Sequence, residues 1–195
     1  MSEAEAASGA EVDLDALTVE TVLRRIAEDV SLVVDRTFSV DKLESSRQDK
    51  RVAGKGKVHI SFKLEINQGG RADYGCVLVP LPDAIALACY LMMVPDDAVK
   101  QRRNAKDLDK ATKDALVEVD NFIGGATDGA LRGIAQEVSA RGAGCQGVRA
   151  DVRPAFPYEE GQPLLVGSAE AQLHDLPAFR MILMLPVIEN IQLDE

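Results

Sequence analysis

The sequence has little basic charge, few histidines and few cysteines, and each shortage excludes a class of function. Its 195 residues include 22 Lys and Arg against 32 Asp and Glu, which gives a formal net charge of −10 at pH 7. A negative surface repels the phosphates of DNA and RNA and the headgroups of anionic lipids. We therefore expect no nucleic-acid partner and no membrane partner.

The three cysteines, Cys76, Cys89 and Cys145, are odd in number, widely spaced and without a Cys-x-x-Cys pattern. This spacing argues against a disulfide framework and against a zinc knuckle. We expect reduced thiols in or near a core, as in a cytoplasmic protein. His59 and His174 are the only histidines. Neither has a partner at metal-ligand spacing, so we expect polar positions on strands and no metal site.

Long apolar runs are also missing. No segment reaches the roughly 18 apolar residues that cross a bilayer. Residues 1–17 are acidic and alanine-rich, without the basic and apolar regions of a signal peptide. We predict a disordered acidic tail over residues 1–17 and a single domain over residues 18–195.

Apolar residues recur at helical spacing in some segments and alternate in others, which distinguishes helices from strands. The predicted elements are a helix over residues 18–34, a polar loop over 38–56, a hairpin of strands over 57–66 and 74–81, a helix over 82–93, a charged connector over 96–106, a long helix over 108–141 that Gly142 and Gly144 stop, a strand near 145–153, a loop over 154–163, and strands over 164–173 and 178–188. The alternation within 57–66 predicts one strand face on the core and one in water. This order predicts an α+β fold, an antiparallel sheet with helices packed on it.

A polar stripe follows the long predicted helix. Asp114, Glu118 and Asn121 are spaced i, i+4 and i+7, which places them within about 60° of one another on a continuous helix. Gly125 and Asp128 extend the same stripe. The opposite side is apolar and should pack on the sheet; it consists of Leu116, Val119, Ile123, Ala126, Ala130 and Ile134. Asp120 lies next to Asn121 in the sequence but points away from the stripe.

The pair Gly124 and Gly125 lies in the middle of this helix, where each glycine costs about 1 kcal/mol relative to alanine. One interpretation is a flat surface beside Asn121 for the backbone of a partner. The other is a kink or simple crowding in the core. Glycine marks close approach in both cases, so both interpretations stay open.

Asp114-x-x-x-Glu118-x-x-Asn121 on a long helix resembles the active-site motif of the CheC, CheX and FliY chemotaxis phosphatases. The order of the flanking elements is similar as well, so the resemblance covers residues 22–188. The motif occurs once, which is closer to the CheX type than to the two-site CheC type. The resemblance implies a CheC/CheX-like fold and a homodimer formed by pairing of sheets, in which the apolar segment 179–188 would be a covered edge.

The resemblance also implies an activity. The substrate would be the phospho-aspartate of a CheY-like receiver domain, attacked in line by water. Asn121 would orient that water, because an amide both donates and accepts hydrogen bonds. Glu118 would pair with a lysine of the receiver, and Asp114, Gly125 and Asp128 would belong to the docking surface. The protein would need no cofactor of its own, because the response regulator would supply Mg²⁺.

Three other interpretations remain. The polar stripe could be a solvated helix face without a catalytic role. The protein could be a non-catalytic chemotaxis or flagellar-switch interaction module of the same fold, because the proline that the family carries downstream of the motif has no counterpart before Pro154. It could also be a small-molecule sensor, which a pocket remote from Asn121 would support.

Two basic segments are further candidates for binding sites. Gly54-Lys55-Gly56-Lys57 lacks the full phosphate-loop pattern and leads into a strand, so we interpret it as a solvated turn. The basic residues within 100–106 are interpreted as part of a solvated connector, with docking of an acidic receiver as the alternative.

Overall fold

The computed structural model describes residues 13–192. Its elements are α1 (Leu14–Val34), β1 (Phe38–Gln48), β2 (His59–Gln68), β3 (Arg71–Pro80), α2 (Leu81–Leu91), α3 (Asp96–Arg102), α4 (Lys110–Arg132), β4 (Val138–Val148), β5 (Leu164–Leu173) and β6 (Phe179–Pro186). α1 begins at Leu14 rather than at the predicted Thr18, because Asp13 Oδ1 caps the helix by accepting hydrogen bonds from the backbone nitrogens of Asp15 and Ala16. Residues 1–12 of the predicted tail lie outside the described residues.

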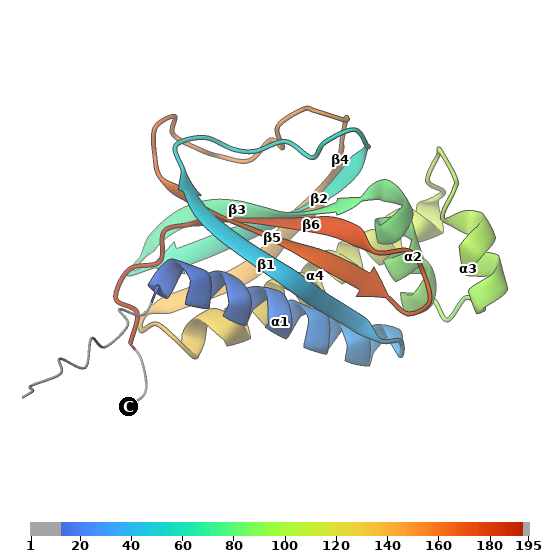
Figure 1. Cartoon of the computed structure of the whole chain (residues 1–195), viewed down its shortest axis with the longest axis horizontal. Coiled ribbons are helices and arrows are strands. Elements are labelled where there is room, and N and C mark those ends of the chain that lie inside the picture. Colours follow the sequence, from blue (N-terminus) through green and yellow to red (C-terminus); the bar gives the residue numbers. More distant parts are fainter. Residues whose placement is uncertain (1–12, 193–195) are drawn as a thin grey trace, which may run out of the picture.

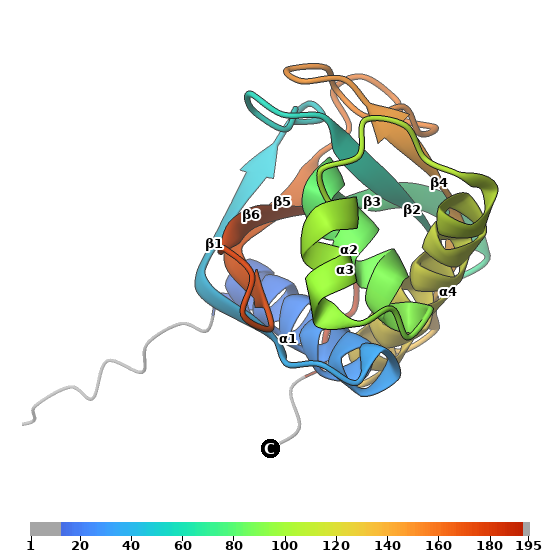
Figure 2. The same cartoon turned by 90° about the vertical axis from the view of Figure 1, so that its right-hand side faces the viewer.

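The six strands found within residues 13–192 form one sheet in the order β1-β5-β6-β3-β2-β4, and every pair in it is antiparallel. The predicted fold class, α+β with helices packed on an antiparallel sheet, is therefore confirmed. α1 and α4 lie on one side of the sheet, and two long loops, residues 49–58 and 149–163, lie on the other (Figures 1 and 2). No helix of the described chain is long and apolar enough to cross a membrane.

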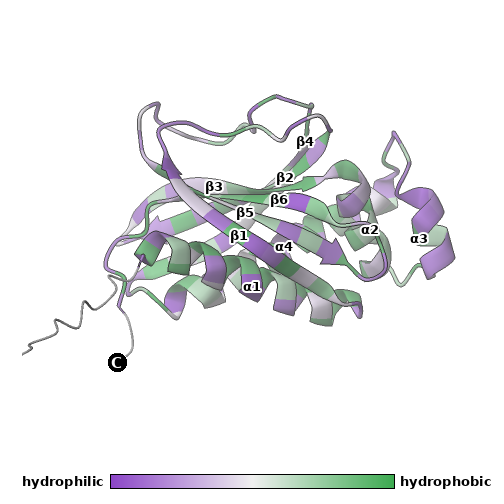
Figure 3. Cartoon of the chain, in the orientation of Figure 1, coloured by the Kyte–Doolittle hydropathy of each residue, from purple (hydrophilic) through white to green (hydrophobic). Residues whose placement is uncertain are grey.

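The larger core lies between the sheet and the helices. α1 contributes Leu23 and Ile26 to it, and β2 contributes Phe62 and Leu64, all of them fully buried. Each such side chain stabilises the fold by about 1.5–3 kcal/mol relative to leaving it exposed. Apolar residues are accordingly frequent in the central strands, whereas β1 carries many hydrophilic residues and α3 is largely hydrophilic (Figure 3).

A second, smaller core covers the opposite face of the sheet. It joins side chains from β3, β5 and β6 to one from the loop over 149–163, namely Cys76, Leu78, Leu164, Val166, Ile182, Met184 and Phe156. The prediction that one face of β2 meets water is therefore wrong at its first half, where His59 and Ser61 are buried. The physical reason is the loop cover, which strand periodicity does not reveal.

The polar segment predicted as a loop contains β1. It pairs with β5 from Phe38 to Gln48, with an irregular register between Asp41 and Glu44. β1 is an edge strand, so several of its charged side chains can face water while its backbone pairs with β5. Lys42, for example, extends to Glu170 of β5, with 2.9 Å between its Nζ and Glu170 Oε1.

The long predicted helix ends at Arg132, and the chain then turns and returns as β4. Gly142 and Gly144 lie within β4, so they do not stop the helix, and the strand predicted near 145–153 is real but begins earlier. β6 also differs from expectation. It lies between β5 and β3, so its two apolar faces reflect a central strand and not a covered edge.

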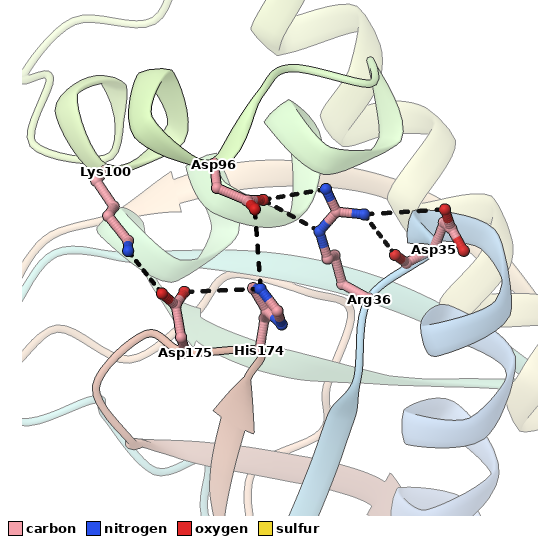
Figure 4. A network of polar contacts seen from close by, with 6 residues as sticks. All are labelled: Asp35, Arg36, Asp96, Lys100, His174 and Asp175. Atoms are coloured by element: carbon pink, nitrogen blue, oxygen red, sulfur yellow. Dashed lines mark hydrogen bonds and ion pairs between the residues drawn. The ribbon is translucent and has the colours of Figure 1, made fainter.

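The charged connector contains α3, which ion pairs hold against neighbouring elements (Figure 4). Arg36, just after α1, approaches Asp96 of α3 with 3.0 Å between Nη2 and Oδ1, and Lys100 of α3 approaches Asp175 with 2.6 Å between Nζ and Oδ2. Arg103, just beyond α3, pairs with the buried carboxylate of Asp83. Two residues of the basic cluster therefore have partners within this chain.

Candidate active site on helix α4

The motif helix begins at a well-formed cap and continues without a break. Asp109 precedes α4, and its Oδ1 accepts a hydrogen bond of 2.7 Å from the backbone nitrogen of Thr112. That bond is the main reason the pKa of Asp109 is lowered. The predicted apolar stripe is buried at five of its six positions, Leu116, Val119, Ile123, Ala126 and Ala130, whereas Ile134 follows the end of the helix.

Glu118 and Asn121 lie side by side on the outer face of α4. Both side chains are exposed, and Asn121 Nδ2 lies 3.4 Å from Glu118 Oε2. Glu118 forms no ion pair with any of residues 13–192. Neither side chain is needed to hold the fold, so both are available to a partner.

The other predicted residues of the stripe have different surroundings. Asp114 is exposed and pairs with Lys110 one turn earlier, with 2.5 Å between its Oδ2 and Nζ. Gly125 is exposed, and a Cβ added to it would meet no atom within 4 Å. Asp128 is half-buried. Its Oδ1 accepts a hydrogen bond from the backbone nitrogen of Ala140 in β4, and its Oδ2 accepts one from Arg132, both 2.8 Å long.

The adjacent glycines Gly124 and Gly125 of α4 have different roles. A Cβ on Gly124 would overlap the backbone nitrogen of Gly142, because the helix and β4 approach closely at this point. Gly125 faces open space instead. Of the two interpretations of the pair, crowding in the core applies to Gly124 and an open surface beside Asn121 applies to Gly125.

Asp120, on the side of α4 that faces β4, is a buried carboxylate next to the candidate site. β4 has an irregular register opposite β2 between Gly142 and Cys145, where Gly144 has φ +93°. The backbone nitrogen of Gly144 donates a hydrogen bond of 2.7 Å to Asp120 Oδ2. Oδ1 is buried without a partner among the described residues. Burial raises the pKa of Asp120 to about 6, although the Gly144 hydrogen bond opposes this.

Two apolar side chains beside the polar pair were not singled out in the sequence. Val117 is 46% exposed and Phe122 is 38% exposed, both on α4. Their position next to the polar stripe was the only sequence signal available.

The site offers positioning rather than a nucleophile. A carboxylate can pair with a cation, and a neighbouring amide can orient a water molecule. Within residues 13–192, no group of three or more His, Cys, Asp or Glu side chains is placed to hold a metal ion.

Comparison with solved structures places this geometry in a known fold. FliY from Thermotoga maritima matches with a TM-score of 0.63 and 11% identity, over 91% of this chain and 92% of that one. CheX from Desulfovibrio desulfuricans matches with a TM-score of 0.57 and 16% identity, over 86% and 96%. A structure of a FliG–FliM complex from H. pylori matches with a TM-score of 0.61 and 8% identity, over 91% and 96%.

These likenesses identify the fold. The chain has the CheC/CheX/FliY-like fold of chemotaxis and flagellar-switch proteins, as the motif resemblance implied. No model of a protein family matches the sequence, and no curated protein matches it either. The identities to these three structures are 16% or lower, so the likeness establishes the fold alone. Any catalytic activity has to be argued from the residues of the site.

Proposed function

We propose that this protein is a phosphatase that hydrolyses the phospho-aspartate of a CheY-like receiver in chemotaxis or related two-component signalling. The observation that supports it most directly is the exposed, adjacent pair of Glu118 and Asn121 on an unbroken helix. A break in α4 or burial of either side chain would have removed this possibility. The acyl phosphate would be the substrate, water the nucleophile and the cytoplasm the location.

In this proposal, each side chain acts across the interface with the receiver. Asn121 holds the attacking water in line with the leaving carboxylate, with its amide both donating and accepting. Glu118 pairs with a lysine of the receiver and fixes the register of the two proteins. Asp114 lies at the rim, Val117 and Phe122 supply apolar contact, and the receiver brings Mg²⁺ with its phosphoryl group.

The two remaining docking residues contribute unequally. Gly125 leaves room beside Asn121 for a partner's backbone. Asp128 already bonds Ala140 and Arg132, so we assign it mainly to holding β4 in place beside the docking surface.

The direct test is phosphate release from a phosphorylated cognate receiver. We expect wild-type protein to accelerate release, and Asn121→Ala and Glu118→Ala each to lose about 100-fold or more of that acceleration, because each removes a positioning group. Matched controls are Gln101→Ala, an exposed amide on α3, and Glu28→Ala, an exposed carboxylate on α1. Both controls should retain wild-type rates. Equal rates in all five proteins would contradict the proposal.

The alternative is a non-catalytic interaction module of the same fold. The likeness to the FliM middle domain and to a structure of the FliG–FliM complex, both from H. pylori, supports it. Such a module would bind a partner stably without shortening the life of its phosphate. A receiver that binds wild-type protein and keeps an unchanged phosphate lifetime would favour this alternative.

A homodimer remains a prediction of the resemblance. The apolar segment 179–188 no longer supports it, because β6 is a central strand and not an edge. Among the described strands only β1 and β4 have a free edge, and each carries an irregular register that hinders edge pairing. Light scattering on the purified chain distinguishes a monomer of 21.0 kDa from a species of twice that mass.

A further inference from the structure

The sheet face opposite α4 holds a pocket of about 550 Å³ that the proposed phosphatase does not use. It lies between the strands β1, β5 and β6 and the chain over residues 52–57, which belongs to one of the two loops on that side in Figure 1. Ligand pockets in proteins have volumes of roughly 300–1,000 Å³. Its size therefore suits a small molecule.

One part of the pocket lining is apolar, and the remainder includes polar side chains such as Ser45, Ser46 and Gln48. Val166 of β5 and Ile182 of β6 line the sheet side, Pro80 lines the end of β3, and Val52 lines the loop side. Val166 and Ile182 also belong to the smaller core. Val166, Ile182 and Pro80 are already largely buried, so an apolar ligand body would cover the small apolar area that they leave open to the pocket.

The rim has the opposite charge from the whole molecule. Lys55, Lys57 and Arg180 line the pocket together with one acidic residue, Glu44. The two lysines are exposed and form no ion pair with any residue from 13 to 192. Arg180 Nη2 donates a hydrogen bond of 2.9 Å to Ser168 Oγ and lies 3.7 Å from Glu44 Oε2. Three cations against one carboxylate favour an anion, on a protein whose net charge is −10.

Hydrogen bonds hold the loop side of the pocket in place. The backbone nitrogen of Asp151 donates to the Gly54 carbonyl over 2.9 Å, and the backbone nitrogen of Gly56 donates to Asp151 Oδ1 over 3.1 Å. Gly54 packs directly on the ring of His59, leaving no room for a side chain there. His59 Nδ1 lies 2.8 Å from the Lys57 carbonyl oxygen. The pocket therefore exists before a ligand arrives, which lowers the ordering cost of binding.

We propose that this pocket binds a small amphipathic anion, whose apolar body lies against Val166, Ile182 and Pro80 and whose single carboxylate or phosphate group meets Lys55, Lys57 and Arg180. The site lies on the opposite side of the sheet from Glu118 and Asn121. Its ligand would make the chain a sensor as well as a candidate enzyme, and the proposal does not depend on phosphatase activity.

The test uses the anionic fluorescent probe 8-anilinonaphthalene-1-sulfonate with the full chain. We expect saturable one-site binding, displaced by decanoate or by decyl phosphate and not by decyltrimethylammonium at the same concentration. Stronger displacement by one of the two anions identifies the headgroup. Val166→Trp should fill the pocket and abolish binding.

Charge variants test the rim without touching the core. Lys55→Glu with Lys57→Glu should raise the Kd of the probe by roughly tenfold. The matched control is Lys106→Glu with Lys113→Glu, two exposed lysines outside the pocket. Glu118→Ala should leave the Kd unchanged, which separates this result from the phosphatase assay. Wild-type affinity in the Lys55/Lys57 variant, or equal displacement by the cation, would overturn the proposal even if Val166→Trp fails to fold.

Discussion

Asp120 is a buried residue whose ionisation affects the stability of this fold. Its carboxylate is buried between α4 and β4, and only one of its two oxygens has a hydrogen-bond donor among the described residues. Burial disfavours the charged form and raises the pKa of Asp120 to about 6. In an unfolded chain, an aspartate has a pKa of about 3.9. The folded state therefore binds this proton more tightly than the unfolded state.

The sign of the pH effect follows from this difference. Because the folded pKa is raised, the stabilisation is fully present below the unfolded pKa and is lost as the pH rises through about 6. Between pH 4.5 and 7.5, we expect wild type to lose about 2 kcal/mol of unfolding free energy relative to Asp120→Asn. Urea unfolding of both proteins at the two pH values measures this change. A change in unfolding free energy that the substitution causes equally at both pH values cancels in the comparison. A difference that does not vary with pH would contradict it.

At the scale of elements, the packing of α4 on β4 depends on glycine at one position of a pair. A Cβ on Gly124 would overlap the backbone of Gly142, and a backbone cannot move aside as a flexible side chain could. Gly125, the next residue, faces open space. The two positions therefore form a matched pair within one helix turn.

Alanine substitutions at the two glycines should have opposite effects. Gly125→Ala should stabilise the protein by up to about 1 kcal/mol, because alanine is the better helix former. Gly124→Ala should destabilise it by about 1–3 kcal/mol, because the added methyl group forces α4 away from β4. Thermal or urea unfolding of the two variants measures both effects. Destabilisation of equal size at both positions would show that helix geometry, and not contact with β4, decides.

At the scale of the whole molecule, the sheet is covered on both faces, by helices on one side and by loops on the other (Figure 1). Phe156 belongs to a loop and is nevertheless buried in the smaller core. Arg51, from the other loop, stacks over it with 5.7 Å to the ring centroid and bonds the Pro154 carbonyl oxygen. The two loops are thus structural parts of the domain.

Truncation of this loop residue should therefore behave like a core mutation. We expect Phe156→Ala to lower the free energy of unfolding by about 3 kcal/mol, within the range for buried phenylalanines. Val152→Ala, at a position in the same loop that is 48% exposed, should change it by less than about 0.5 kcal/mol. If both substitutions are neutral, the loop does not contribute a core.

The sequence by itself determined the features that local periodicity controls. These include α1, the β2–β3 hairpin, β5, the apolar stripe of α4 and the adjacency of Glu118 and Asn121, because i, i+3 spacing on a helix fixes which side chains are neighbours. Only the tertiary structure decided the features that depend on distant segments. β1 is a strand because it pairs with β5. α4 ends at Arg132, and β4 then runs back along the helix beside Asp120 and Gly124. β6 is a central strand of the sheet. The pocket beside β5 and β6 joins residues far apart in the chain, and no local sequence pattern predicts that they meet.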